Sequence, residues 1–148
     1  MARHHHTPAG DVPFTPDEEA EWDAREAADA LPNALAAFRR KRDQVVNTGV
    51  MHEGNRWHSD PLSQHAMGTA VTLAREYEAA FSQPWSTQWK TLTGYVTVTA
   101  DALVAAGFAV GAHVQAAFAR EDELITLASN DLAAALAAAE TGWPENGQ

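Results

Sequence analysis

Cysteine is absent from the 148-residue sequence, and this absence excludes several kinds of chemistry. Disulfide bonds, thiolate nucleophiles and cysteine-ligated zinc sites all require this residue. Long apolar runs are also lacking, because polar residues interrupt the alanine-rich stretches. A membrane helix needs about 20 predominantly apolar residues, so we expect no membrane span. No apolar segment follows the first six residues, so we also expect no signal peptide.

Basic residues are scarce. Ten Lys and Arg stand against twenty Asp and Glu, which gives a formal net charge of −10. Nucleic-acid-binding proteins gain much of their affinity by neutralising phosphates, so this balance argues against a nucleic-acid partner. The sequence is nevertheless 45% hydrophobic and 20% charged, which is typical of a folded chain.

Charge and residue pattern divide the chain into three predicted parts. Residues 1–32 hold two basic and eight acidic side chains, and we expect an extended acidic arm that ends in a short helix. Residues 33–128 are predicted to form a small α+β domain, and residues 129–148 an Ala-rich C-terminal helix and tail. The predicted fold class is α+β, mainly α, with three to four helices and two short β-hairpins.

Two helices are predicted on either side of a proline. Residues 15–18, Thr-Pro-Asp-Glu, have the pattern of a capping box with proline at the first helical position. They predict a helix to about Leu31. Pro32 is expected to end it, and Asn33 can cap a second helix that continues to about Thr48.

Two hairpins and two further helices are predicted beyond this point. Residues 50–58 alternate around a Glu-Gly-Asn turn, and residues 87–98 around Thr-Gly. The alternation predicts that Trp57 is buried. Asp60 and Thr99 can each cap a following helix, and the last helix either breaks at residues 129–131 or projects from the domain. The helix after Asp60 carries an apolar stripe that we expect to face the core: Leu62, Ala66, Ala70, Leu73, Tyr77 and Phe81.

Seven histidines raise the question of a metal site. Residues 4–6 are three consecutive histidines in the expected arm, where nothing fixes their geometry. A second set has the ligand types of a 2-His-1-carboxylate or zinc site, but its spacing matches no short metal motif. This set is His52, His58, His65 and Asp60. We favour surface packing for it, and for His113 a buried or half-buried position with one hydrogen-bond partner.

Sequence motifs of catalysis are lacking: the chain has no G-x-S-x-G, no S-x-x-K and no glycine-rich phosphate loop. We therefore predict no enzyme, no catalytic residue, no cofactor and no metal. A small metal-dependent enzyme built on His52, His58 and Asp60 is the alternative from another functional class.

Residues from about 40 to 128 resemble a domain of unknown function that is common in tail and tail-fibre-associated proteins of tailed bacteriophages. The resemblance rests on residues 42–43, on Gly-Asn-Arg-Trp-His-Ser-Asp at 54–60, on Gln64, on the Trp85–Trp89 region and on residues 103–118. The family pattern has an acidic turn after the tryptophan, whereas this chain has Lys90 and Thr91 there.

Residues 8–20, Pro-Ala-Gly-Asp-Val-Pro-Phe-Thr-Pro-Asp-Glu-Glu-Ala, resemble a segment of small phage tail proteins, some of which are assembly chaperones. The two resemblances imply a non-enzymatic tail component, structural or adaptor, near the tail tip or the fibre attachment. A tail or tail-fibre assembly chaperone that is not retained in the virion is the alternative. They also imply other phage tail proteins as partners, location in the virion tail, and the host cytoplasm during assembly.

Five side chains are predicted to bind partners. Phe14 and Trp22 are the aromatic residues of the first thirty, and the marginal helix beside them needs a surface to lie on. Leu132, Leu136 and Trp143 follow helical spacing in an alanine-rich segment that could bury little apolar area by itself. We expect residues 131–143 to be a contact surface outside the core, with self-association through this helix as one use.

Overall fold

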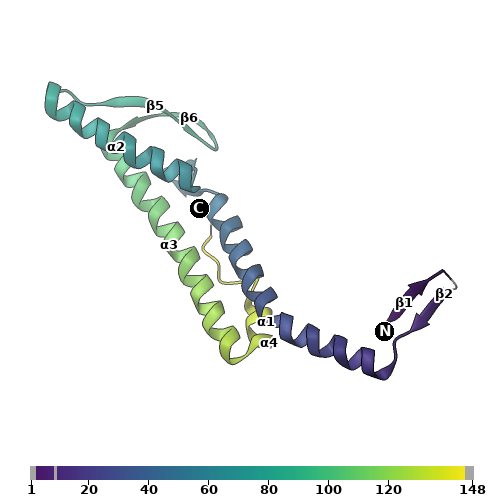
Figure 1. Cartoon of the computed structure of the whole chain (residues 1–148). Helices are drawn as coiled ribbons and strands as arrows, with labels where there is room; N and C mark the ends of the chain where they lie inside the picture. The colour runs from purple at the N-terminus through teal and green to yellow at the C-terminus, as the bar shows by residue number, and fades with distance from the viewer. Residues whose placement is uncertain (1–2, 9, 146–148) are drawn as a thin grey trace. The chain divides into compact units, whose positions relative to one another are not determined.

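The computed structural model describes residues 3–8 and 10–145, within which the chain forms four helices and three antiparallel two-stranded sheets (Figure 1). This confirms the α+β, mainly α, class. The elements in chain order are β1 (His4–Thr7), β2 (Gly10–Pro13), α1 (Pro16–Asn47), β3 (Val50–His52), β4 (Asn55–Trp57), α2 (Pro61–Phe81), β5 (Ser86–Thr91), β6 (Gly94–Thr99), α3 (Ala100–Asn130) and α4 (Leu132–Ala138). Contacts divide the chain into an N-terminal unit, up to residue 37, and a C-terminal unit from residue 38.

The N-terminal unit begins with a hairpin where we expected an extended arm. β1 pairs with β2 in a register that runs from His4 opposite Pro13 to Thr7 opposite Gly10. Gly10 has a φ of 120°, a backbone conformation that L side chains rarely adopt. Residues 4–7 and 10–13 are extended, as expected of an arm, but they pair with each other as a hairpin, which the sequence analysis did not predict.

The start of α1 confirms the predicted capping box. The Thr15 hydroxyl accepts a hydrogen bond from the Glu18 N–H at 3.3 Å, and the Glu18 carboxylate accepts one from the Thr15 N–H at 2.8 Å. This backbone hydrogen bond and a second one from the Thr15 hydroxyl lower the pKa of Glu18. Each of the two residues thus satisfies a donor that the first helical turn leaves without a helical partner.

Helix α1 continues through Pro32, which corrects the prediction of two helices separated there. A proline inside a helix removes one hydrogen bond, here the bond to the Ala28 carbonyl, and crowds that carbonyl. The residues around Pro32 are mostly alanine and leucine, which are strong helix formers. Their summed preference outweighs one local defect, so the proline lies in the interior of a 32-residue helix.

We expect Pro32→Ala to stabilise this helix by about 1–3 kcal/mol, because alanine restores the missing hydrogen bond and proline is the poorest helix former. Slower amide hydrogen exchange in residues 20–31 would measure the gain. Asn33→Ala is the matched control, and its effect should stay below about 1 kcal/mol. Unchanged or faster exchange in Pro32→Ala would show that the proline is not a defect in this helix.

The core of the C-terminal unit lies between the end of α1, the hairpin β3–β4, α2 and α3. These four elements and strand β6 supply its buried apolar side chains: Val46, Val50, Trp57, Met67, Val98, Leu103, Ala106, Val110, Val114 and Ala117. Val98 belongs to β6, and two half-buried tryptophans pack against the core, Trp89 from β5 and Trp85 from the residue before it. Trp57 is only 3% exposed, which confirms its predicted burial. Its indole N–H donates to the His52 carbonyl at 3.2 Å.

Both predicted caps of this unit are confirmed. Asp60 accepts a hydrogen bond from the Ser63 N–H at 3.0 Å at the start of α2, and Thr99 accepts one from the Ala102 N–H at 3.2 Å at the start of α3. Helix α3 ends at Asn130 and Asp131 caps α4, so the last helical segment breaks where its sequence allowed.

The cap at Asp60 makes the stability of the C-terminal unit depend on pH. The Ser63 hydroxyl and then the Ser63 N–H donate to the Asp60 carboxylate and lower its pKa. A carboxyl group whose pKa is lower in the folded state stabilises the fold at pH values above its unfolded pKa of about 3.9. This stabilisation is lost as the pH falls through the pKa of the folded state. We therefore expect Asp60→Ala to destabilise by about 1 kcal/mol at pH 7 and by much less below pH 3.

Urea unfolding at several pH values would measure this effect. Asp60→Asn is the control, because asparagine also caps helices but carries no charge. If Asp60→Ala and the unchanged chain differed by the same free energy at pH 7 and pH 3, the carboxylate would not be the stabilising group.

Helix α3 corrects the expectation that no segment approaches a membrane span. In the described part of the chain it is the one helix long and apolar enough to cross a membrane by length and composition, with a mean hydropathy of 1.6 over its best 18 residues. One such helix is weak support for a span, since core helices pass the same test. Here Leu103, Val110 and Leu124 of α3 are buried in the C-terminal unit.

Candidate docking surface

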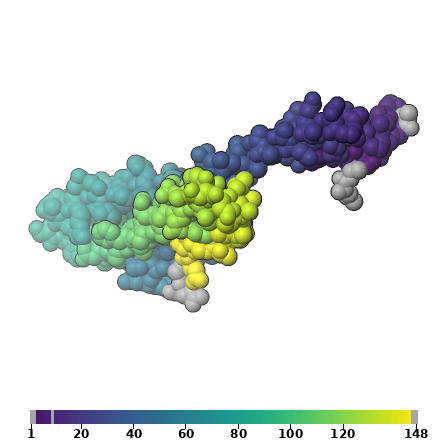
Figure 2. Space-filling model, turned by 90° about the horizontal axis from the view of Figure 1, so that it is seen from below, coloured from purple at the N-terminus to yellow at the C-terminus, as the bar shows by residue number. Residues whose placement is uncertain are grey.

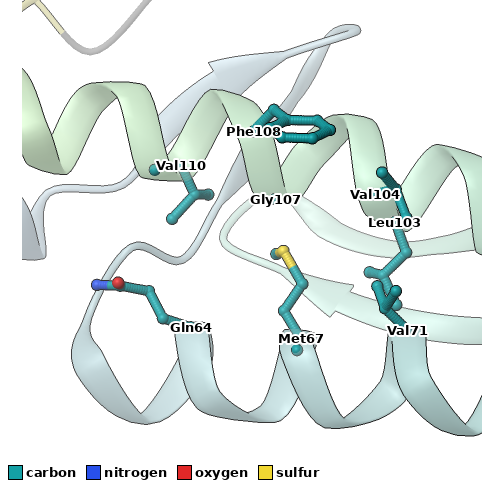
Figure 3. Close-up of a pocket in the computed structure, with 10 residues that line it drawn as sticks. Gln64, Met67, Val71, Leu103, Val104, Gly107, Phe108 and Val110 are labelled. Carbon is teal, nitrogen blue, oxygen red and sulfur yellow. The ribbon is translucent and has the colours of Figure 1, made fainter.

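An apolar groove lies between α2 and α3 in the C-terminal unit (Figure 3). Its volume is about 370 Å³, and its lining comes from both helices: Gln64, Met67, Gly68, Val71, Leu103, Val104, Gly107, Phe108, Val110 and Gly111. In Figure 3, Met67 points from α2 toward α3, and Leu103 and Val110 point back toward α2. Gln64 is the only polar side chain of this lining, so the groove suits an apolar group.

Three glycines shape this groove. A Cβ atom at Gly107 would lie 3.3 Å from the Met67 sulfur, so this glycine lets α3 approach α2 closely. A Cβ atom at Gly68 or Gly111 would meet no atom within 4 Å. These two positions therefore leave open space along the groove where larger side chains would fill it.

Most of the predicted apolar stripe of α2 does not face the core, which corrects the prediction from its spacing for every member except Ala70, which packs against the core. Leu62 is 77% exposed and Phe81 is 63% exposed, and Leu73 and Tyr77 are also exposed. The buried positions of α2 are Met67 and Ala74. The helix therefore packs on α3 through its small and flexible side chains, and its larger apolar side chains remain on the surface.

Phe108 adds to this surface from α3, where it lines the groove with 76% of its area exposed. The apolar character of Phe108 does not by itself separate it from the core residues of α3. A helical projection would have done so, because Leu103, Val110 and Val114 share one face and Phe108 lies well off it. Exposed apolar side chains of this size commonly mark contact sites.

Phe14 and Trp22 lie together in the N-terminal unit. Their ring centroids are 5.9 Å apart, and His5 stacks on Phe14 at 4.4 Å. The Phe14 ring is half-buried, whereas Trp22 remains 40% exposed and its indole N–H donates to Glu26 at 2.9 Å. The hairpin and α1 thus partly cover Phe14 within their own unit. Partner binding by these two residues stays a prediction.

The base of α1 in this unit holds one arginine among three carboxylates. Arg3 contacts Glu19 at 2.6 Å, Asp23 at 2.7 Å and Glu26 at 2.8 Å, on successive turns of the helix. The pKa of Arg3 is raised, first by the hydrogen bond to Asp23 and then by that to Glu19. These pairs join the chain just before the first hairpin to α1, and the Arg3 guanidinium also lies 5.9 Å from the centre of the Trp22 ring.

The C-terminal segment packs on the rest of the C-terminal unit, which corrects the expectation that residues 131–143 lie outside the core. Helix α4 packs on α3, and in Figure 2 the yellow C-terminal segment lies against the yellow-green end of α3. Ala135 of α4 is completely buried. Arg120 of α3 donates to the Ala138 and Thr141 carbonyls at 3.0 and 3.1 Å. The small alanine side chains of α4 allow it to approach α3 closely.

The three predicted contact residues of this segment differ in exposure. Leu132 is half-buried, and Trp143 is half-buried with its indole N–H donating to the Ala139 carbonyl at 2.7 Å. Leu136 is 51% exposed and is the one of the three that offers a large free surface. Self-association through α4 stays a prediction, and Leu136 is the residue on which it would depend.

The candidate metal residues are not gathered into one site. His58 Nδ1 lies 4.0 Å from Asp60, but among the described residues no three His, Asp or Glu side chains are placed to hold a metal ion. His113 is buried with its Nε2 atom 3.1 Å from the Val45 carbonyl, which confirms its predicted position and partner type.

A buried ion pair joins α1 to α3 in the C-terminal unit. Arg42 contacts Glu121 at 2.5 Å, and it also contacts Asp43 at 2.6 Å and stacks on the Phe118 ring at 4.6 Å. The hydrogen bond to Asp43 is the main reason that the pKa of Arg42 is raised, followed by that to Glu121. Glu121 is almost fully buried, so its charge is stabilised mainly by this one guanidinium.

The sequence profile of a family described as a domain of unknown function, DUF4376, matches residues 21–141. This match covers more than half of the chain. The chain belongs to the DUF4376 family. The DUF4376 range includes the groove between α2 and α3, the Arg42–Glu121 pair and α4, and it leaves the first hairpin outside. No curated protein and no solved structure matches the chain.

Proposed function

We propose that this protein is a non-enzymatic component of a bacteriophage tail, a structural or adaptor protein near the tail tip or the fibre attachment. The observation that carries the proposal is the resemblance of residues 8–20 and 54–60 to segments of phage tail proteins. Its partners are then other tail proteins, and it resides in the virion tail after assembly in the host cytoplasm. The acidic composition is the reason for proposing protein partners and no nucleic acid.

The exposed apolar surface of the C-terminal unit supports a role in protein contacts. Leu62, Leu73 and Phe81 of α2 expose most of their area, and Phe108 of α3 projects beside the groove. Exposed apolar patches on soluble proteins commonly mark interaction sites. We place the contact with a neighbouring tail protein at the groove, because it combines an exposed aromatic ring with an open apolar space.

Quantitative mass spectrometry of purified virions tests this proposal. A tail component is expected at a fixed copy number relative to the major tail protein. Abundance in infected cells together with absence from purified virions would contradict the proposal and favour the assembly chaperone. Equal amounts in particles that lack tails and in complete virions would also contradict a place in the tail.

A pair of variants tests the contact surface. We expect Phe108→Ser to lower incorporation into virions at least fivefold, since it removes the most exposed aromatic ring of the groove. Tyr95→Ser is the matched control, because Tyr95 is 73% exposed on β6 and does not line the groove. Equal incorporation of the two variants would place the contact elsewhere on the molecule.

A further inference from the structure

Strand β6 forms an open edge of the hairpin β5–β6 in the C-terminal unit (Figure 1). All six residues of β6 pair with β5, and no other described strand pairs with β6. Strand β4 contacts this hairpin on the β5 side, and the Leu92 N–H in the turn donates to the Arg56 carbonyl of β4 at 2.7 Å. The other side of β6 is therefore free for a further strand.

Two residues of β6 turn their backbone groups toward this free side. In an antiparallel pair, residues that exchange hydrogen bonds with the partner strand alternate with residues whose N–H and C=O groups point away from it. The two-residue turn at 92–93 makes Thr91 and Gly94 the first hydrogen-bonded pair, so Tyr95 and Thr97 face away from β5. Among the described residues, no backbone hydrogen bond joins Tyr95 or Thr97 to another element.

The sequence of β6 does not protect this edge. Proteins commonly shield a free edge strand with lysine or other charged residues, with proline or with a bulge. Of the described strands, β6 alone has no proline, no histidine and no charged residue, and its register with β5 has no interruption. Residues 95–98, Tyr-Val-Thr-Val, are all strong strand formers. Such an edge favours pairing with another strand.

A second copy of β6 fits this edge. In an antiparallel pair with its two-fold axis at Val96, Tyr95 of one copy lies opposite Thr97 of the other, and the axis repeats this pair. The outward backbone groups of Tyr95 and Thr97 then face each other, and each pair exchanges two hydrogen bonds. The free donors and acceptors of one edge are thus satisfied by those of the other.

The charge distribution allows two copies to meet here, although the chain is acidic. The net charge is −10, but Lys90 is the only charged residue between positions 86 and 99. In the paired arrangement the two Lys90 residues lie on the outer strands of a four-stranded sheet. Strands are spaced by about 4.8 Å, so the outer ones are about 14 Å apart, beyond the screening length of about 8 Å at physiological salt. The two strands that meet are neutral.

We propose that two copies of this chain associate through β6 and join their β5–β6 hairpins into one four-stranded antiparallel sheet. Tyr95 of each copy pairs with Thr97 of the second copy. The contact is small, so we expect a weak dimer with a dissociation constant of the order of 0.1 mM. This inference stands apart from the proposed function, because it rests on the free edge of β6 and not on the resemblance to tail proteins.

Sedimentation equilibrium of the full chain from about 10 μM to 1 mM would measure the dimer. We expect Thr97→Pro to raise the dissociation constant at least tenfold, because proline removes the outward N–H and leaves the bonds to β5 in place. Gln88→Pro is the matched control, since Gln88 lies opposite Thr97 on β5 and its N–H faces away from β6. Its effect should stay below about twofold. A monomer at 1 mM, or equal effects of the two prolines, would overturn the proposal.

Thr97→Lys tests the same edge without a change of the backbone, and thermal melting checks that each variant is folded. The two lysines would be diagonal neighbours across the axis, so we expect the dissociation constant to rise about fivefold or more. Gln88→Lys adds the same charge to β5 and should change it less than about twofold. Tyr95→Ser keeps the backbone bonds and should weaken the dimer less than about fivefold. If Leu136→Ser abolished the dimer and neither Thr97 variant weakened it, self-association would belong to α4 and this proposal would be wrong.

Cysteine substitution locates the two-fold axis, because the chain has no cysteine of its own. Val96→Cys places two thiols opposite each other in a non-hydrogen-bonded pair, whose Cα atoms are about 4.5 Å apart and within the range of a disulfide. With diamide as the oxidant, we expect this variant to form cross-linked dimers at least about fivefold faster than Gln88→Cys on β5. Non-reducing gels would measure both rates. Equal rates would place the contact away from β6.

Discussion

Replacing Trp57 by alanine is expected to lower the free energy of unfolding of the C-terminal unit by about 3–5 kcal/mol. The ring is 3% exposed and belongs to the cluster that also contains Val46, Val50 and Met67. Its removal leaves a large cavity, and it also removes the N–H that donates to the His52 carbonyl. The cluster that contains Trp57 joins the hairpin β3–β4 to α1, α2 and α3, so collapse around the gap would need the hairpin to move.

Urea unfolding followed by far-ultraviolet circular dichroism would measure this loss. Trp22→Ala is the matched control, because this tryptophan is 40% exposed and lies in the N-terminal unit. Its removal should reduce stability by about 1 kcal/mol or less. If Trp57→Ala lowered the free energy of unfolding by no more than Trp22→Ala does, Trp57 would contribute no more to stability than an exposed ring.

The second large effect is expected at the buried ion pair. Arg42→Ala should destabilise the C-terminal unit by about 3–5 kcal/mol, because it leaves the Glu121 carboxylate buried without its close cation. Among the described residues, the other basic group within 4 Å of that carboxylate is Arg39, at 3.9 Å, and its own side chain is largely exposed. The change also removes the guanidinium from the Phe118 ring, where it contributes a cation–π contact.

A double variant separates the loss of the ion pair from the free-energy cost of leaving one buried charge without a partner. Arg42→Met combined with Glu121→Met should cost less than Arg42→Ala alone, because no unpaired charge then remains buried. Arg39→Ala is the control for a weak partner and should reduce stability by about 1 kcal/mol or less. If the double variant were as unstable as Arg42→Ala, the pair would act through packing and not through charge.

Local sequence rules were sufficient for most element ends in the C-terminal unit. The cap at Asp60, the proline after it and the end at Phe81 agree with the predicted helix, and both predicted hairpins form around their turns. These features depend on hydrogen bonds and backbone preferences within a few residues of each other. The first hairpin was missed for a related reason, since only the observed pairing of β1 with β2 distinguishes a glycine turn from an irregular arm.

The same local rules failed where the combined effect of many residues outweighed one local signal. Pro32 was expected to end a helix, but the surrounding helix formers outweigh its local cost. The stripe from Leu62 to Phe81 was assigned to the core from its spacing, although spacing identifies a face and not its neighbour. Helix α2 turns Met67 and Ala74 inward because Gly107 lets α3 approach at that point.

The mainly helical α+β class, the helix caps, the turns of the two hairpins after residue 49 and the burial of Trp57 and His113 could be predicted from the amino-acid sequence. Each of these follows from interactions between near neighbours or from a clear alternation of apolar and polar residues. Two features became apparent only from the folded chain: which face of α2 is buried, and that α4 returns to pack on α3. The physical reason is that these features depend on contacts between segments distant in the chain, and such contacts are set by how side chains of several elements fill space together.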